Sequence, residues 1–429
     1  LDPLSPRINQ QGTIGMNSRA FFISFFIAGF AFGPSTYAQN KGNEKQLQQL
    51  LKQFPAADTN QDGKLTWREA LAYRAKMGAD TGNRNRGRGV PTTFDVDTGW
   101  ELEQFPKEAV CYMPASQIKA TYAKVAAGKG PAVVSHSKPT DGALRVVGVG
   151  HSFMMPGYKT MPLIAKGAGM DQPLYTHVGG GMTGSARSKW EQENGIFGFK
   201  GKPYPKLLSS IANAEWEAMM FGPYFQDQPK YYSCWIDFCL KYNPEMKFFL
   251  SDAWPQLVQL KEKPKSEAFF TDEVLDQLAE ERKEMHALVI DPLRKAYPGK
   301  VFILPTSDSM VLAAKHFVRG ELPGIEGLHQ VIGKKERSLW RDQLGHLGPG
   351  LERLEGYVFY ATLYGKSPEL IEDNIPFGGN TTFPSTSLDQ MFRKIAWQAV
   401  SEHPYSGITD TNGDGIGDAF KEPVLQGSP

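Results

Sequence analysis

The 429-residue chain has few cysteines, almost no net charge and a single long apolar run. Its three cysteines are too few for a disulfide framework. Cys234 and Cys239 lie five residues apart in a predicted helix, a spacing that excludes a bridge between them, and Cys111 is left open as a partner for either. The formal net charge of +1 excludes a strong overall positive potential that would attract nucleic acid or an anionic membrane.

The single long apolar run lies near the beginning of the chain. A short polar and positive stretch runs from Met16 to Arg19, residues 20–30 are almost entirely apolar, and small residues lead to Ala38. This order is typical of a secretory signal peptide, with cleavage after Ala38, and it predicts a secreted or periplasmic protein without a membrane span after cleavage. We expect residues 1–38 to comprise the signal and an upstream extension before Met16. The alternative is a retained N-terminal anchor.

Residues 58–69 fit the twelve-residue loop of an EF-hand, within a predicted helical module at 39–80. The expected ligands at positions one, three, five, seven, nine and twelve are Asp58, Asn60, Asp62, Lys64 through its carbonyl, Thr66 and Glu69. Gly63 allows the sharp turn at position six, and Leu65 is the apolar residue that packs inward. Ca²⁺ prefers six to eight hard oxygen ligands, so the pattern predicts a calcium site. The alternative is an Asp/Gly turn without metal.

A second acidic loop lies in the predicted Asp/Gly-rich tail, residues 405–429. Its candidate ligands around Gly415 are Asp410, Asn412, Asp414 and Asp418. Position twelve of this loop is Lys421, which cannot ligate a cation. The spacing resembles the calcium loops of dockerins and thrombospondin type 3 repeats more than an EF-hand, and the alternative is a flexible acidic tail.

Between these loops the chain divides into a connecting segment and a larger domain. Residues 81–141 are predicted to be a linker and connecting segment, because 81–89 are rich in glycine and have no apolar side chain to bury. From residue 142 short apolar runs alternate with helical stretches. Strands are predicted at 144–149, 218–221, 247–250 and 301–304, and helices at 271–295, 309–320 and 391–402. This alternation predicts an α/β fold with a parallel sheet covered on both faces.

Ser152 follows the first predicted strand, and the carboxyl ends of strands are where such sheets hold their chemistry. Its hydroxyl would lie at the mouth of the sheet, and its amide would face a developing oxyanion. Residues 176–184 are predicted to form a glycine-rich turn with further exposed amides. Far downstream, Asp342 closely precedes His346. A serine with a histidine base and an orienting carboxylate predicts nucleophilic catalysis.

Several stretches resemble SGNH (GDSL-type) hydrolases, in particular a secreted bacterial branch. They are residues 216–224, 304–310, 320–324, 340–347, 357–368 and 395–400. The resemblance covers residues 142–404. It implies a flavodoxin-like, three-layer α/β/α fold and ester hydrolysis, often of acylated carbohydrates. It also implies that Ser152 is the nucleophile, that His346 is the general base, and that Gly180 or Gly181 supplies an oxyanion amide.

The chain departs from the family pattern at three positions. Gln343 stands three residues before His346, where the family has Asp, and Asp342 lies one residue further back. Gly222 holds the place of an Asn or Gln that donates to the oxyanion, and His151 precedes the serine. Loss of one such donor typically costs about 3 kcal/mol of transition-state stabilisation.

Two functions from different classes therefore compete. The first is a calcium-binding, exported serine esterase that acts on an acylated carbohydrate. The second is a catalytically inactive domain on the same fold, which binds a glycan or a protein with calcium stabilising the assembly. The sequence leaves the oligomeric state open.

Overall fold

The computed structural model describes much of the chain after residue 132 and short pieces before it. The described residues are 47–48, 51–52, 54–65, 69, 73, 133–178, 207–222, 229–252, 254, 257, 260, 263–372, 375, 377 and 383–421. The predicted signal peptide and most of the predicted connecting segment lie outside them.

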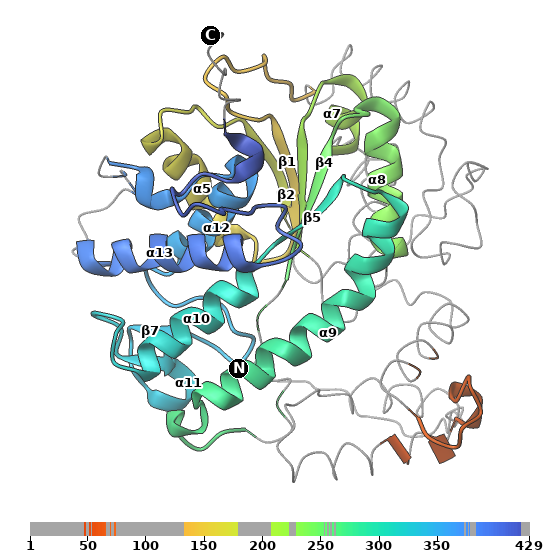
Figure 1. The fold of residues 1–429 in the computed structure, drawn as a ribbon, viewed down its shortest axis with the longest axis vertical. Helices are drawn as coiled ribbons and strands as arrows, with labels where there is room; N and C mark the ends of the chain where they lie inside the picture. The colour runs from red at the N-terminus through yellow and green to blue at the C-terminus, as the bar shows by residue number, and fades with distance from the viewer. Residues whose placement is uncertain are drawn as a thin grey trace, which may run out of the picture.

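Five parallel strands form the central sheet, in the order β2-β1-β3-β4-β5 (Figure 1). Their bounds are β1 (Val146–Gly150), β2 (Leu174–Val178), β3 (Ala218–Phe221), β4 (Lys247–Ser251) and β5 (Val301–Leu304). Strand β1 is the second strand in this order and pairs with β2 and β3, so that Val146 lies between Leu174 of β2 and Ala218 of β3. The predicted parallel sheet is confirmed. The prediction that 176–184 form a turn is wrong at its start, since β2 extends to Val178.

Successive residues of an inner strand are buried on opposite faces of the sheet, which explains the continuous apolar run of β3. In β3, Ala218 and Met220 belong to one hydrophobic cluster, whereas Met219 and Phe221 belong to the other. All four side chains are 0% exposed. A strand covered on both sides has no polar face, so its sequence does not alternate.

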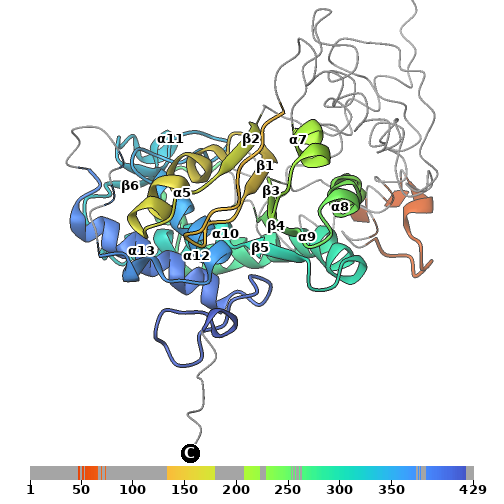
Figure 2. The ribbon, with the colours of Figure 1, turned by 90° about the horizontal axis from the view of Figure 1, so that it is seen from above.

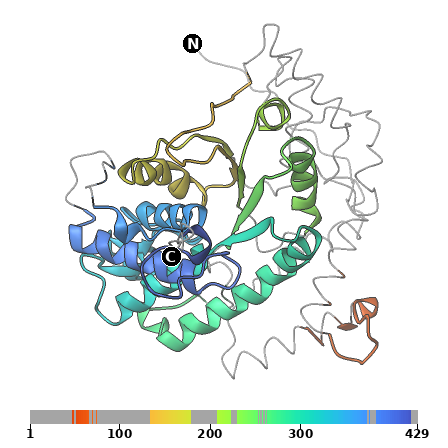
Figure 3. The same cartoon turned by 45° about the horizontal axis from the view of Figure 1, so that its top comes forward.

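Helices cover both faces (Figures 2 and 3). One cluster holds side chains of α5 (Met155–Gly167), α10 (Thr306–Val318), α12 (Glu352–Tyr364) and α13 (Thr386–Glu402). The other holds α7 (Leu207–Asn213), α8 (Lys230–Tyr242) and the second half of α9 (Asp272–Ala296). Helix α9 spans both clusters, because Leu275 packs in the first and Val289 in the second. None of the helices in the described part of the chain is long and apolar enough to cross a bilayer.

Smaller elements complete the domain. A parallel pair, β6 (Gly327–His329) and β7 (Ser338–Trp340), flanks the short helix α11 (Gln330–Gly333). The single-turn 3₁₀ helices are η1 (Pro55–Ala57), η4 (Glu267–Phe269), η5 (Pro368–Leu370) and η6 (Asp418–Phe420).

The segment after α13 packs against the domain. The Ile303 amide of β5 donates to the Tyr405 carbonyl oxygen at 2.9 Å, and the Gly417 amide donates to the Gly365 carbonyl oxygen at 2.7 Å. Ile408 is only 4% exposed within the first cluster. Residues 403–421 therefore belong to the packed fold, and the alternative of a flexible acidic tail is wrong for them.

Candidate active site

Ser152 lies in the tight turn between β1 and α5. The Met154 amide donates to the His151 carbonyl oxygen at 3.1 Å, which closes the turn. Gly150, the last residue of β1, has a φ of 145°, and a Cβ atom there would lie 2.7 Å from Met154 Cγ. Glycine is therefore required at the start of the turn. The turn leaves the Ser152 side chain exposed at the carboxyl end of β1.

His346 lies in a short loop that leaves β7 and returns alongside it. Leu347 forms an antiparallel bridge with Trp340, and the Arg341 amide donates to the His346 carbonyl oxygen at 2.8 Å. These bonds close residues 341–346 into a loop that we call the histidine loop. The histidine loop is thus attached directly to β7, which lies outside the main sheet.

Ser152, His346 and Asp342 form one hydrogen-bonded chain. Ser152 Oγ lies 2.6 Å from His346 Nε2, and His346 Nδ1 lies 2.7 Å from Asp342 Oδ2. Both distances are in the hydrogen-bonding range. The histidine side chain is 18% exposed and the aspartate side chain 41%, so the imidazole is shielded while water reaches the carboxylate. The structure brings together the three side chains that the sequence singled out.

The turn of the histidine loop explains how Asp342 reaches His346 across one extra residue. Asp342 Oδ1 accepts hydrogen bonds from the backbone amides of Leu344 at 3.0 Å and His346 at 3.2 Å. Gly345 supplies a φ of 85°, a left-handed conformation that suits glycine. The carboxylate thus folds the loop and holds the imidazole at the same time. Gln343, at the family position, is not needed for orientation.

The electrostatics of Asp342 suit an orienting carboxylate. Burial alone would raise its pKa, but hydrogen bonds from the His346 backbone and side chain outweigh burial and leave the pKa below its ordinary value. The carboxylate is therefore ionised at neutral pH. It favours the tautomer with the proton on Nδ1, and Nε2 then presents its lone pair to the serine hydroxyl.

The oxyanion side of the site differs from the family pattern. Within the described part of the chain, no residue accepts a hydrogen bond from the Ser152 amide, so that donor is available. Gly180 and Gly181 lie outside the described residues. At Gly222, after β3, a Cβ atom would overlap Met154 Cγ and lie 3.3 Å from Gly150 Cα. Met154, which is 0% exposed, fills the space where a side-chain donor would begin.

Gly222→Asn is therefore expected to destabilise the protein rather than to restore a donor. Overpacking of this kind typically costs about 1–3 kcal/mol, measurable as a lower free energy of unfolding in denaturant. In a double-mutant cycle with Met154→Ala, the same Asn substitution should cost less, because the truncated side chain leaves room for it. An equal cost in both backgrounds would show that Met154 does not control this position.

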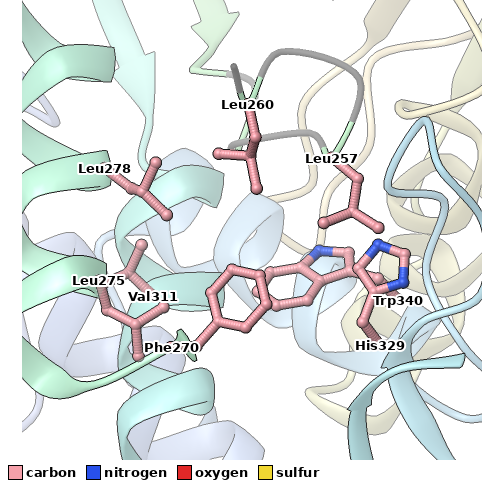
Figure 4. A pocket seen from close by; sticks show the side chains of 8 residues that line it. All are labelled: Leu257, Leu260, Phe270, Leu275, Leu278, Val311, His329 and Trp340. Atoms are coloured by element: carbon pink, nitrogen blue, oxygen red, sulfur yellow. The ribbon is translucent and has the colours of Figure 1, made fainter. Parts of the chain in front are cut away.

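A small apolar cavity lies next to the Trp340 side chain of β7 (Figure 4). It is lined by Leu257, Leu260, Phe270, Leu275, Leu278, Val311, His329 and Trp340. Its volume is about 20 Å³, which is room for about one water molecule. Among the residues that the structure describes, the buried Trp340 Nε1 has no hydrogen-bond partner. Burial lowers the pKa of His329 to about 4. The cavity is too small for an acyl group.

The described part of the first acidic loop, residues 58–65, forms a turn held by its own side chains. The Asp58 carboxylate accepts from the amides of Asp62 at 3.3 Å and Gly63 at 2.9 Å. Asn60 Oδ1 accepts from the Asp62 amide at 3.1 Å, and Asp62 Oδ1 accepts from the Lys64 amide at 2.8 Å. Gly63 has a φ of 76°. The side-chain oxygens of Asp58, Asn60 and Asp62 thus stabilise the turn by accepting from its backbone amides.

The inner side of this loop is apolar. Leu65 is 6% exposed and clusters with Ala57, and partly buried side chains of Leu47, Leu51, Phe54 and Tyr73 pack around them. Glu69 accepts a hydrogen bond from Thr59 Oγ1 at 3.2 Å, and Thr66 lies outside the described residues. Among the residues described, no three His, Cys, Asp or Glu side chains gather at one point. The donor types and the turn suit Ca²⁺, although the carboxylates do not converge.

The aromatic side chain of Trp254, which follows β4, is a part of the site that the sequence did not reveal. Its indole Nε1 donates to the Gly345 carbonyl oxygen in the histidine loop at 2.6 Å. Nothing in the local sequence marks this residue, because the contact joins positions 91 residues apart.

The chain is similar to known proteins only at the level of distant solved structures. No family model matches the chain, and no curated protein matches it. Among solved structures, the chain is similar to a DUF4886 family protein from Bacteroides uniformis, at 13% identity and a TM-score of 0.38, over 60% of this chain and 95% of that one. It is also similar to a protein of Streptococcus pneumoniae provisionally described as a platelet activating factor, at 12% identity and a TM-score of 0.29, over 62% and 96%.

Proposed function

We propose that the chain is an exported serine ester hydrolase of the SGNH type with a calcium-binding EF-hand module. The observation that carries the proposal is the chain of hydrogen bonds from Asp342 through His346 to Ser152, at 2.7 and 2.6 Å. The strand order 2-1-3-4-5 supports it, because it is the flavodoxin-like order and β1 ends at the switch point of the sheet. Acylated carbohydrate is the proposed substrate class.

The proposed reaction begins with acylation of the serine. His346 Nε2 accepts the Ser152 hydroxyl proton while Oγ bonds to the ester carbonyl carbon. Asp342 stabilises the imidazolium that forms. The tetrahedral oxyanion is held by the Ser152 amide and by amides of Gly180 and Gly181. The imidazolium then gives its proton to the leaving alcohol as the ester bond breaks. Water repeats the sequence on the acyl-serine and releases the acid.

Active-site labelling tests this proposal. A fluorophosphonate reacts with a serine only when a neighbouring base activates it, so the native protein should form one adduct, located by peptide mass spectrometry at Ser152. His346→Ala should abolish labelling although Ser152 is present, and unfolded protein should not react. A native protein that stays unlabelled would overturn the esterase proposal.

Calcium is proposed to bind residues 58–69, where it would order the N-terminal module without a part in catalysis. Glu69→Gln is expected to weaken Ca²⁺ binding by roughly tenfold or more, because position twelve supplies two charged oxygens. Titration calorimetry of the whole chain measures the change. Lys64→Ala is the matched control, because residue 64 would offer only its backbone carbonyl oxygen to the ion. The Ca²⁺ affinity of this variant should stay within about twofold of the parent's. Equal affinities of the Gln variant and the parent would place the ion elsewhere.

A second candidate is a non-catalytic domain that binds a glycan or a protein. The observation in its favour is the packing of Met154 over Gly222, which leaves no side-chain oxyanion donor from β3. Absence of fluorophosphonate labelling, together with calcium-dependent binding to a glycan array, would support this candidate.

A further inference from the structure

Trp254 joins the two halves of the proposed site. Its side chain is almost completely buried, at 1% exposed. The indole Nε1 donates to the Gly345 carbonyl oxygen at 2.6 Å, and Gly345 immediately precedes His346. The ring face stacks on Phe153, with centroids 4.8 Å apart and planes inclined by 10°, and Phe153 immediately follows Ser152. One side chain thus contacts the neighbours of both the serine and the histidine.

Phe153 extends this contact to the imidazole itself. Its ring meets the His346 ring edge to face, with centroids 5.0 Å apart and an interplanar angle of 87°. Aromatic pairs prefer such offset and perpendicular arrangements. The imidazole is therefore held on three sides by Asp342, by Ser152 and by a ring that Trp254 supports.

Trp254 is itself fixed from the other side. Arg282 of α9 donates through Nη2 to the Trp254 carbonyl oxygen at 3.1 Å, and the Arg282 side chain is buried. The segment after β4 is thereby tied to α9. Strand β7 belongs to the two-stranded sheet and does not pair with the main sheet. Trp254 therefore connects the histidine loop, which follows β7, to the serine turn, which follows β1 of the main sheet.

We propose that Trp254 is a positioning residue that sets the distance between Ser152 and His346. This inference rests on the proposed esterase function. The indole hydrogen bond holds the histidine loop, and the indole face holds the residue after the serine. Loss of the hydrogen bond should leave the fold intact and loosen the histidine loop alone.

Trp254→Phe tests the proposal, because phenylalanine keeps a stacking face and loses the N–H donor. We expect kcat for p-nitrophenyl acetate to fall roughly 10- to 100-fold, with KM within about twofold, since small displacements of reacting groups have effects of this size. Hydrogen exchange of the amides in residues 341–348, measured by mass spectrometry, should become faster. Trp235→Phe, a fully buried tryptophan of α8 in the opposite cluster, should change neither quantity.

The two readouts separate failure of this inference from failure of the proposed function. If the parent hydrolyses ester through Ser152 and Trp254→Phe does so equally well, the positioning role is wrong and the esterase stands. If the parent shows no serine-dependent hydrolysis, the esterase is wrong. Unchanged exchange in residues 341–348 would overturn the anchoring role of Trp254 in either case.

A second, independent inference concerns the loop at 410–421. This loop repeats the internal hydrogen bonds of the loop at 58–69. In both, the first Asp accepts from the fifth and sixth amides, the third-position Asn accepts from the fifth amide, and the fifth-position Asp accepts from the seventh. In the second loop the donors are the amides of Asp414, Gly415 and Ile416, and the acceptors are Asp410, Asn412 and Asp414, at 2.9–3.4 Å.

The two loops differ in what stands at position twelve. Lys421 replaces the glutamate, and its ammonium group lies among the side-chain oxygens of the loop. Lys421 Nζ donates to Asn412 Oδ1 at 2.6 Å and to Asp418 Oδ1 at 2.9 Å. It lies 3.4 Å from Asp414 Oδ2 and 3.9 Å from Asp410 Oδ1. An internal positive charge is thus in contact with all four predicted metal ligands.

The loop is also fastened to the core. The Ser367 amide, after α12, donates to the Gly415 carbonyl oxygen at 2.7 Å, and Lys366 forms an antiparallel bridge with Ile416. The loop is therefore attached to the residues that directly follow α12.

We infer that the Lys421 ammonium is the resident cation of this loop and holds it closed without Ca²⁺. Lysine and Ca²⁺ compete for the same oxygens, and two positive charges within a few ångströms of each other repel. The earlier prediction of a second calcium site at these residues requires Lys421 to leave. This inference does not depend on the esterase proposal.

The test uses the full chain with the first loop silenced by Asp58→Asn and Glu69→Gln. That protein should bind no Ca²⁺ in titration calorimetry. Adding Lys421→Glu should create one site, with a Kd between about 10⁻⁷ and 10⁻³ M, the range of sensor and extracellular calcium loops. Lys421→Gln, which removes the cation without adding a carboxylate, should lower the thermal midpoint relative to Lys421. Stoichiometric Ca²⁺ binding while Lys421 is present would overturn the inference.

Discussion

Ser152→Ala is expected to reduce hydrolysis of p-nitrophenyl acetate by at least about 10³-fold. The substitution removes the only atom that can form the acyl-enzyme and leaves the amide of residue 152 in place. Removal of a triad member in serine hydrolases leaves a residual acceleration from the oxyanion hole and binding alone. We therefore expect kcat to fall while KM changes little. Steady-state kinetics of both proteins, corrected for spontaneous hydrolysis, provide the measurement.

The control for this variant is Ser401→Ala on α13, where the hydroxyl donates to the carbonyl oxygens of Trp397 and Gln398 in its own helix. It should retain the activity of the parent. Assays with Ca²⁺ and with a chelator should give the same ratio of parent to Ser152→Ala, because calcium has no proposed step in the reaction. Equal rates for Ser152→Ala and the parent would assign the hydrolysis to another group.

The strands were the part of the fold most accessible to prediction. Residues 218–221 and 301–304 were predicted with the bounds that β3 and β5 have, because burial on both faces leaves an uninterrupted apolar run. The helix predicted from residue 309 begins three residues earlier in the structure, where α10 starts at Thr306. Thr306 and Ser307 are polar, and their helical placement depends on bonds to Asp252 after β4, at 3.1 and 2.9 Å. Such contacts across the sheet leave no mark in a local pattern.

The three residues of the proposed catalytic chain were found from the sequence, but their geometry was not. The spacing of Asp342 and His346 departs from the family, and only the turn at Gly345 shows that the carboxylate reaches the ring. Trp254 carried no signal of its role, and the position of Lys421 in the loop indicated only that it cannot ligate a cation. Trp254 acts through a contact between separate elements, which no local pattern encodes, whereas Lys421 acts within its own loop through contacts that become visible only once the loop is folded.

Asp342→Asn is expected to lower kcat by roughly 10²- to 10⁴-fold with little change in KM or in the free energy of unfolding. Asparagine keeps the size of the side chain and its acceptor oxygen for the amides of Leu344 and His346, which hold the histidine loop. Its amide group can instead donate to Nδ1, which places the imidazole proton on Nε2 and removes the base that faces the serine. The partial exposure of Asp342 reduces the expected effect relative to a fully buried carboxylate.

Glu326→Gln is the matched control for this variant, because it neutralises a carboxylate of similar exposure that pairs with Arg337 at 2.6 Å. It should leave kcat within about twofold. A loss in Asp342→Asn that appears mainly in KM would indicate a role in substrate binding. Full activity of Asp342→Asn would show that its hydrogen bond to His346 folds the loop without serving the reaction. The proposed mechanism requires instead that both functions of this carboxylate, holding the loop and fixing the tautomer, separate in this one substitution.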